Sequence, residues 1–285
     1  MNNAVSKCSR SRAMLRHVIS HLRRQDWTSV FIELVIVILG VFIGIQVSNW
    51  NQAQADVQLG RDYAKRLAHD LSADLAGVRA EIAYYSAVLE SVRKTDALLG
   101  EPDPDPRELV VNAYRATEIL YNPPVRATWD QIVSSGHLGL LPARAVEAGL
   151  SQYFAFDTAQ DLYDTGRASD YRQRVREIIP LGMQIAMHST CSDVRDRHGN
   201  ITGFAEQCEF EADPGALKAV AAALRGDPAV AASLRYQYSF AINATLNLGR
   251  VRDDIEGALD ALGAKPQAAG KAAPDLTRAS VLTGR

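Results

Sequence analysis

Residues 30–47 read VFIELVIVILGVFIGIQV, and this stretch decides the architecture of the chain. It contains one charged residue, Glu33, and Trp27 and Trp50 bracket it. A helix needs about 20 apolar residues to cross a bilayer core, and aromatic side chains favour the two interfaces. A soluble helix is rarely apolar on every side over such a length. The sequence therefore predicts a transmembrane helix over residues 30–50.

Charge is distributed unevenly about this helix. The chain has a formal net charge of −2, but residues 1–29 hold six basic residues against one acid, so they carry +5 and the remainder −7. Positive residues favour the cytoplasmic flank of a span. We therefore expect a protein of the bacterial inner membrane, with a cytoplasmic arm (residues 1–29) and a periplasmic domain (residues 51–263). The basic arm is expected to meet the lipid bilayer and not nucleic acid.

Two features beside the span leave alternatives open. Ala53-Gln54-Ala55 resembles a signal-peptide cleavage site, so cleavage after Ala55 competes with a permanent anchor. The apolar run is longer than the about 7–15 residues of a signal-peptide core, which favours the anchor. Residues 13–24 have apolar residues on one helical face and arginines on another. They predict a short amphipathic helix on the cytoplasmic membrane surface, the alternative being a disordered basic tail.

Beyond the span, apolar residues recur at spacings of three and four over residues 67–92. This near-heptad seam predicts one helix over about 53–99 that ends at Gly100. The seam packs within one chain or pairs two chains, and we expect packing within one chain. Its members are Leu67, Leu71, Leu75, Val78, Ile82, Tyr85, Leu89 and Val92.

Further helices are predicted from their start and stop signals, so the fold class is mainly α, a helical bundle. Asp followed by Pro, a capping residue before a favoured first position, occurs at residues 105, 213 and 227. Thr128 and Gln131 have the form of a capping box. Pro180 predicts a kink, and Gly226 and Gly263 suit C-terminal caps. The expected helices cover about 106–121, 128–135, 142–156, 158–189, 214–225 and 228–262, followed by a disordered tail over 264–285.

The cysteines fit an exported domain. Cys8 lies in the cytoplasmic arm, where we expect a free thiol. Cys191 and Cys208 follow the span, and an oxidising periplasm predicts a disulfide between them, the alternative being two buried thiols. Residues 190–212 lack helical periodicity and contain turn-forming glycines. We expect a small disulfide-closed loop or β-hairpin there.

Two blocks resemble a family of uncharacterised bacterial single-pass membrane proteins. The first is the span from Glu33 to its exit, where the motif residues are Gln46, Asn49, Trp50 and Asn51. The second is residues 128–140, TWDQIVSSGHLGL, followed by Gln152-Tyr153-Phe154. The resemblance covers about 50 of the 285 residues. It implies the topology and the helical fold class, and it implies no catalytic residue. We expect residues 128–135 to form a short helix, with Leu138 and Leu140 returning to the core.

One face of the span is suited to helix association. Glu33, Val37, Gly40, Gly44 and Val47 follow one another at spacings of four and three. Glycines four apart permit close helix approach, and an intramembrane carboxylate favours a protein partner over lipid. The face predicts a homodimer or docking to a partner's membrane helix. The alternative is a monomer in which Glu33 reaches the interface beside an arginine of the arm.

A search for chemistry yields weak candidates. Ser134, Ser135 and His137 are too close in sequence to form the usual nucleophile–base pair. A loop cluster is the best metal candidate, although its spacing fits no established site. We expect the acidic clusters Asp70/Asp74 and Asp253/Asp254 to be solvated, and we expect no catalytic residue, metal or cofactor. The members of the loop cluster are His188, Cys191, Asp193, Asp196 and His198.

Three function classes follow. The first is a membrane-anchored, non-enzymatic periplasmic interaction or scaffold protein. The second is a periplasmic ligand-sensing bundle that signals through a partner membrane protein, because the cytoplasmic arm is too short for an output domain. The third is a hydrolase. A pocket lined by carboxylates with perturbed pKa values would favour the hydrolase, whereas a closed apolar core would count against it.

The association face generates the first prediction. Replacing Gly40 and Gly44 with Ile should abolish self-association in a membrane two-hybrid assay, because the added side chains keep the helices apart. An unchanged signal would contradict the predicted face.

Overall fold

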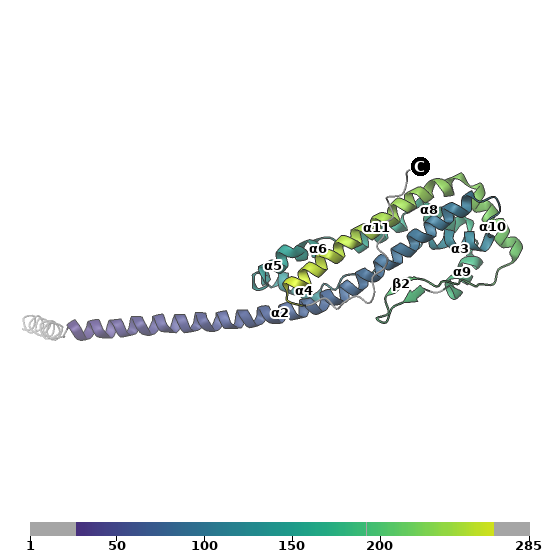
Figure 1. Ribbon diagram of the computed structural model, residues 1–285. Helices are drawn as coiled ribbons and strands as arrows, with labels where there is room; N and C mark the ends of the chain where they lie inside the picture. The colour runs from purple at the N-terminus through teal and green to yellow at the C-terminus, as the bar shows by residue number, and fades with distance from the viewer. Residues whose placement is uncertain (1–26, 192, 265–285) are drawn as a thin grey trace, which may run out of the picture. The chain divides into compact units, whose positions relative to one another are not determined.

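A computed structural model describes residues 27–191 and 193–264 of a mainly helical chain (Figure 1). It forms two compact units, of which the first ends at Leu59 and the second begins at Gly60. The expected amphipathic helix over 13–24, Cys8 and nearly all of the tail lie outside the described residues. The elements are α2 (Trp27–Gly100), α3 (Pro106–Arg115), α4 (Ala127–Ser134), η1 (Leu138–Leu140), α5 (Ala143–Ala145), η2 (Val146–Leu150), α6 (Ser151–Ala155), α7 (Thr158–Arg167), α8 (Asp170–Ile178), α9 (Leu181–Thr190), β1 (Asp193–Arg195), β2 (Ile201–Phe204), α10 (Pro214–Gly226) and α11 (Pro228–Ala261).

The first unit is the apolar start of α2. Among the described residues, α2 is the one helix long and apolar enough to cross a membrane, with a mean hydropathy of 2.7 in its most apolar window. No residue of that window is buried. A Cβ on Gly40 or Gly44 would meet nothing within 4 Å, and Glu33, Val37 and Val47 are exposed. The predicted transmembrane helix and the predicted helix over 53–99 are one continuous helix.

The second unit is built on the rest of α2, and the predicted apolar seam lies in its core. Seven of the eight seam residues are buried, while Ile82 is half-buried. The seam therefore packs within one chain. The buried face of α2 is wider than predicted, because it also takes in Asp74 and Glu81, which are 8% and 1% exposed.

Helix α11 runs antiparallel to this part of α2. The rings of Tyr85 and Phe240 meet edge to face at 5.9 Å, and Arg79 forms an ion pair of 2.7 Å with Glu256. Both helices extend along the second unit in Figure 1. Helices α3, α8 and α10 pack around one end of the pair, and their apolar side chains share one core cluster with residues of α2, α9 and α11.

The capping signals are confirmed where an Asp precedes a Pro. The carboxylates of Asp105, Asp213 and Asp227 each accept a backbone N–H from the first turn of their helix. Gly263 has a φ of +76° and closes α11, as expected of a C-terminal cap. The capping box at Thr128 is wrong: α4 starts one residue earlier, and Thr128 is buried inside the helix. Gly226 ends α10 without adopting a left-handed conformation.

Three predicted helices are shorter or broken. The helix expected over 158–189 is split into α7, α8 and α9, because Ser169 caps α8 and Pro180 lies between α8 and α9. The helix expected over 142–156 breaks at Gly149, where φ is +102°. A Cβ on Gly149 would lie 3.1 Å from an oxygen of Asp254 in α11, so close packing also favours glycine there. The helix expected over 106–121 ends at Arg115.

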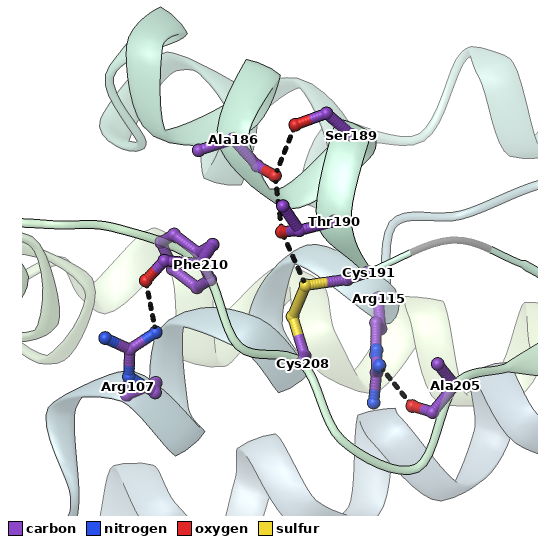
Figure 2. The surroundings of a disulfide bond; sticks show 9 residues. All are labelled: Arg107, Arg115, Ala186, Ser189, Thr190, Cys191, Ala205, Cys208 and Phe210. Atoms are coloured by element: carbon purple, nitrogen blue, oxygen red, sulfur yellow. Dashed lines mark hydrogen bonds between the residues drawn. A yellow bond between two sulfur atoms is a disulfide. The ribbon is translucent and has the colours of Figure 1, made fainter.

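A disulfide-closed hairpin follows α9, as the sequence predicts. Cys191 and Cys208 pair with a Cα–Cα distance of 4.7 Å (Figure 2). Strands β1 and β2 form an antiparallel pair between them. Arg107 and Arg115 of α3 donate hydrogen bonds of 2.9 and 2.6 Å to backbone carbonyls beside Cys208. The hairpin is thus held by one covalent link and by arginine contacts to backbone.

Removing the disulfide should lower stability. In the chain-entropy model, a crosslink across 17 residues restricts the unfolded chain and stabilises by about 3 kcal/mol. We expect Cys191→Ser/Cys208→Ser to lower the free energy of unfolding by that order in denaturant titrations. Cys8→Ser is the matched control. Unchanged stability in the double variant would contradict a structural disulfide.

Candidate functional site

Buried side chains of α2 satisfy the backbone of the segment 116–126, which links α3 to α4 without regular structure. The Tyr85 hydroxyl donates to the Leu120 carbonyl at 3.1 Å. One turn away, Oε1 of Glu81 accepts the N–H of Asn122 at 2.9 Å, and Oδ1 of Asp74 accepts the N–H of Val125 at 2.9 Å. An extended segment over a helix needs such partners, because a buried backbone N–H without one is costly.

Asp74 is buried and fully engaged, which corrects the expectation that Asp70 and Asp74 are both solvated. Its second oxygen, Oδ2, accepts the hydroxyl of Tyr153 at 2.8 Å. Burial raises the pKa of Asp74, the two hydrogen bonds lower it, and the charge of Asp70 raises it. Burial and the neighbouring Asp74 raise the pKa of the Tyr153 phenol. Asp74 therefore joins α2, the linking segment and α6.

The block formed by residues 128–140 and 152–154 belongs to this joint. Trp129 of α4 stacks on Phe154 of α6 with ring centroids 4.7 Å apart, and Arg126 donates to the Phe154 carbonyl at 2.8 Å. Leu138 is 36% exposed and Leu140 is half-buried, so the expected return of both to the core is wrong. Leu141 is the buried residue instead. The block has a structural account in these contacts.

Glu81 is a buried acid with a strongly raised pKa. Its side chain is almost fully buried, and burial raises its pKa to about 8, a shift that the charge of Asp157 increases and the Asn122 hydrogen bond opposes. The carboxyl is therefore mostly neutral at pH 7. Nδ2 of the adjacent Asn122 is buried and has no hydrogen-bond partner. Such a group in a concave site is a candidate for function.

Glu81 and Asn122 line a cavity of about 1020 Å³. Helix α11 forms one wall, and α6, α7 and the start of α8 form the other. The lining is mixed in character, with aromatic, amide, hydroxyl and carboxylate groups. Its aromatic members are Tyr153, Phe156, Tyr171, Tyr236 and Phe240, and its acidic and basic members are Glu81, Asp157, Asp161, Asp170, Asp254 and Arg250.

Close contacts set the positions of the cavity walls. A Cβ on Gly166 of α7 would lie 2.6 Å from Ile119 and 2.8 Å from Phe240, so only glycine allows α7 to pack at this distance. Gln237 of α11 is buried, accepts the hydroxyl of Ser169 at 2.8 Å and donates to the Ala116 carbonyl at 2.7 Å. These contacts fix the start of α8 against α11 beside the cavity.

Carboxylates dominate the charge of the lining. Asp157 caps α7 through the N–H of Gln160, and Tyr121 donates to its other oxygen at 3.4 Å. Asp254 is half-buried, and burial followed by the charge of Asp253 raises its pKa. The expectation of a solvated pair therefore holds for the exposed Asp253 and is wrong for Asp254.

The other candidates do not come together as a site. His137 bonds through Nδ1 to the Tyr63 hydroxyl at 3.0 Å, whereas the hydroxyls of Ser134 and Ser135 donate to the Gln131 carbonyl. In the loop cluster, Cys191 is in the disulfide, and Asp196 accepts backbone N–H groups of its own turn. Within residues 27–191 and 193–264, no three His, Cys, Asp or Glu side chains are placed to hold a metal ion.

The sequence contains a signal for the burial of the two acids of α2, although the pattern of apolar residues alone does not show it. Asp74, Val78, Glu81, Tyr85 and Val88 follow one another at spacings of four and three. The two acids thus occupy positions of a heptad seam, where an apolar residue is usual. A carboxylate at such a position indicates either a buried polar partner or a ligand. The spacing does not identify Asn122 or Asp254 as partners, because these residues reach the site from distant parts of the sequence.

Glu81→Gln should change how stability depends on pH. The folded state keeps a proton that the unfolded chain releases near the ordinary value of 4.5, so the free energy of unfolding falls as pH rises from there to about 8. The amide keeps an acceptor for Asn122 and removes this loss. Unfolding of the full chain in nanodiscs should show the variant gaining at least about 1 kcal/mol on the wild type between pH 5 and pH 8.

Glu90→Gln, on the exposed face of the same helix, is the matched control. A difference between Glu81→Gln and the wild type that does not change with pH would contradict the buried, neutral carboxyl.

Comparisons with known proteins add no family to this description. No protein-family model matches the chain, and no curated protein and no solved structure matches it. The site is therefore interpreted from its own geometry.

Proposed function

We propose that this chain is a membrane-anchored helical domain that binds a small organic ligand in the cavity between α7 and α11. One observation carries the proposal: a cavity of about 1020 Å³ whose lining includes the buried carboxyl of Glu81. Of the function classes derived from the sequence, the ligand-sensing bundle agrees best with it.

The size and lining of the cavity support binding of a small molecule. Ligand sites commonly measure about 300–1,000 Å³ and combine apolar walls with a few placed polar groups. Here the aromatic rings supply apolar surface, while Asn122, Gln237 and Asn243 supply amides. A scaffold protein with a closed apolar core would have no use for such a lining.

The proposed setting is the bacterial inner membrane, with the arm in the cytoplasm and the second unit in the periplasm. The apolar start of α2 and the positive charge before it support this orientation. We propose that a ligand signal passes to a partner membrane protein, and that the Glu33–Val47 face is the surface for this contact.

An interaction or scaffold role is the second proposal. Leu181 and Ile185 lie one turn apart on α9 and are 72% and 59% exposed. Neighbouring exposed apolar side chains favour contact with another protein. This role and ligand binding use different surfaces of the second unit, so they are compatible.

We propose that the cavity binds its ligand without catalysing a reaction, although a carboxyl with a perturbed pKa in a pocket would also favour a hydrolase. The described residues that line the cavity include no histidine, cysteine or lysine. The hydroxyl of Ser169 is already committed to Gln237. Glu81 itself has a structural task in accepting the N–H of Asn122.

Filling the cavity tests ligand binding. Neutral fluorinated aromatic fragments would be screened against the full chain in nanodiscs by fluorine NMR. Ala159 is a small residue of the α7 wall, so Ala159→Trp should abolish binding of every hit by occupying the space. Ala223→Trp, on the exposed face of α10, is the matched control and should leave binding unchanged. A screen without hits, or hits that Ala159→Trp retains, would contradict the proposal.

A further inference from the structure

We propose that the ligand of this cavity is an organic cation, a protonated amine carried on a flat apolar body. This inference rests on the proposed function and narrows it to one chemical class. Three features of the lining carry it: its charge, the burial of one carboxyl and the exposure of two aromatic rings.

The charge of the lining favours a cation. The described lining residues include five carboxyl groups and one cation, Arg250. The Arg250 guanidinium donates to the side-chain oxygen of Asn247 at 3.3 Å, on its own helix. An anionic ligand would meet like charge from α7, α8 and α11, whereas a cation would meet opposite charge from each of them.

Two buried acids on α2 differ in a way that singles out Glu81. Both Asp74 and Glu81 accept a backbone N–H of the linking segment. Asp74 also accepts the Tyr153 hydroxyl and does not line the cavity, so its environment is complete. Glu81 does line the cavity, and Asp157 faces it from α7. A buried acid near a second acid is unfavourable when charged, and a cation beside both relieves that cost.

The aromatic rings of the lining favour a flat apolar body. Phe156 is 60% exposed and Tyr236 is 83% exposed, and they come from opposite walls, after α6 and on α11. Large exposed aromatic rings beside a cavity are available for stacking. Aromatic rings also attract a cation placed over their faces, an attraction that an acidic neighbourhood reinforces.

The test uses three indoles of one shape and different charge: tryptamine, tryptophol and indole-3-acetate. Binding to the full chain in zwitterionic nanodiscs would be measured by calorimetry at pH 7.5. We expect tryptamine to bind at least about tenfold more tightly than tryptophol, because a charged hydrogen bond is the stronger one, and indole-3-acetate to bind most weakly. Equal or tighter binding of either indole-3-acetate or tryptophol would overturn the proposal.

Variants separate charge from shape. Glu81→Gln and Asp254→Asn should each reduce the preference for tryptamine over tryptophol several-fold, whereas Asp74→Asn, outside the lining, should preserve it. Tyr236→Ala, at an exposed position, should weaken all three indoles alike and keep their order. A preference for tryptamine that survives both Glu81→Gln and Asp254→Asn would overturn the assigned site.

The outcome also distinguishes this inference from the proposed function. If no indole binds while neutral fragments bind the wild type and not Ala159→Trp, the cation class is wrong and the cavity remains a binding site. If neither indoles nor fragments bind, both proposals fail.

Discussion

The second unit depends on how one irregular segment satisfies its backbone. Residues 116–126 lie against α2 without forming a helix or a strand. The N–H groups of residues 116–118 still bond to carbonyls of α3, whereas the N–H groups farther along the segment need partners from side chains. Tyr85, Glu81 and Asp74, spaced over three turns of α2, provide hydrogen-bond partners. This solution places two carboxyl groups inside a helical core, where burial opposes their ionisation. The unusual electrostatics of the site are thus a consequence of a backbone requirement.

The cavity lies beside this segment, and Asn122 and Pro124 of the segment contribute to its lining. The walls of the cavity meet α11 through close contacts. Gly166 against Phe240 and Ser169 against Gln237 are two of these contacts. Between these contacts, side chains of mixed polarity line the space between the helices, and no interlocking apolar core fills it. Departures from simple apolar patterning are expected at functional sites.

Much of the fold could be predicted because its signals are local. A capping Asp before a Pro needs only its own first turn, and Asp105, Asp213 and Asp227 behave as predicted. The pairing of Cys191 with Cys208 follows from their being the two cysteines beyond the span. The breaks at Gly149 and Ser169 depend on α11, whose Asp254 and Gln237 approach them only in the folded chain. The pattern of a single helix cannot report such partners.

The candidate site could not be predicted from local sequence patterns for the same reason. The apolar seam identifies the buried face of α2, but it assigns Ile82 to the core where Glu81 lies deeper. Only the folded structure shows that Asn122, Asp157 and Asp254 line the same cavity as the Glu81 carboxyl. Tyr153, in the second of the two blocks singled out in the sequence, contributes to the lining, but the block itself shows no sign of the cavity.

The disulfide has a mechanical consequence for the chain under tension. If tension were applied between α2 and the C-terminus, the 17-residue separation between Cys191 and Cys208 could not be extended, because the covalent link carries the load. Extended chain spans about 3.4 Å per residue, so roughly 55 Å of contour length stays hidden from the pulling force. The two ends of the hairpin would stay linked even if the helices on either side of it unfolded.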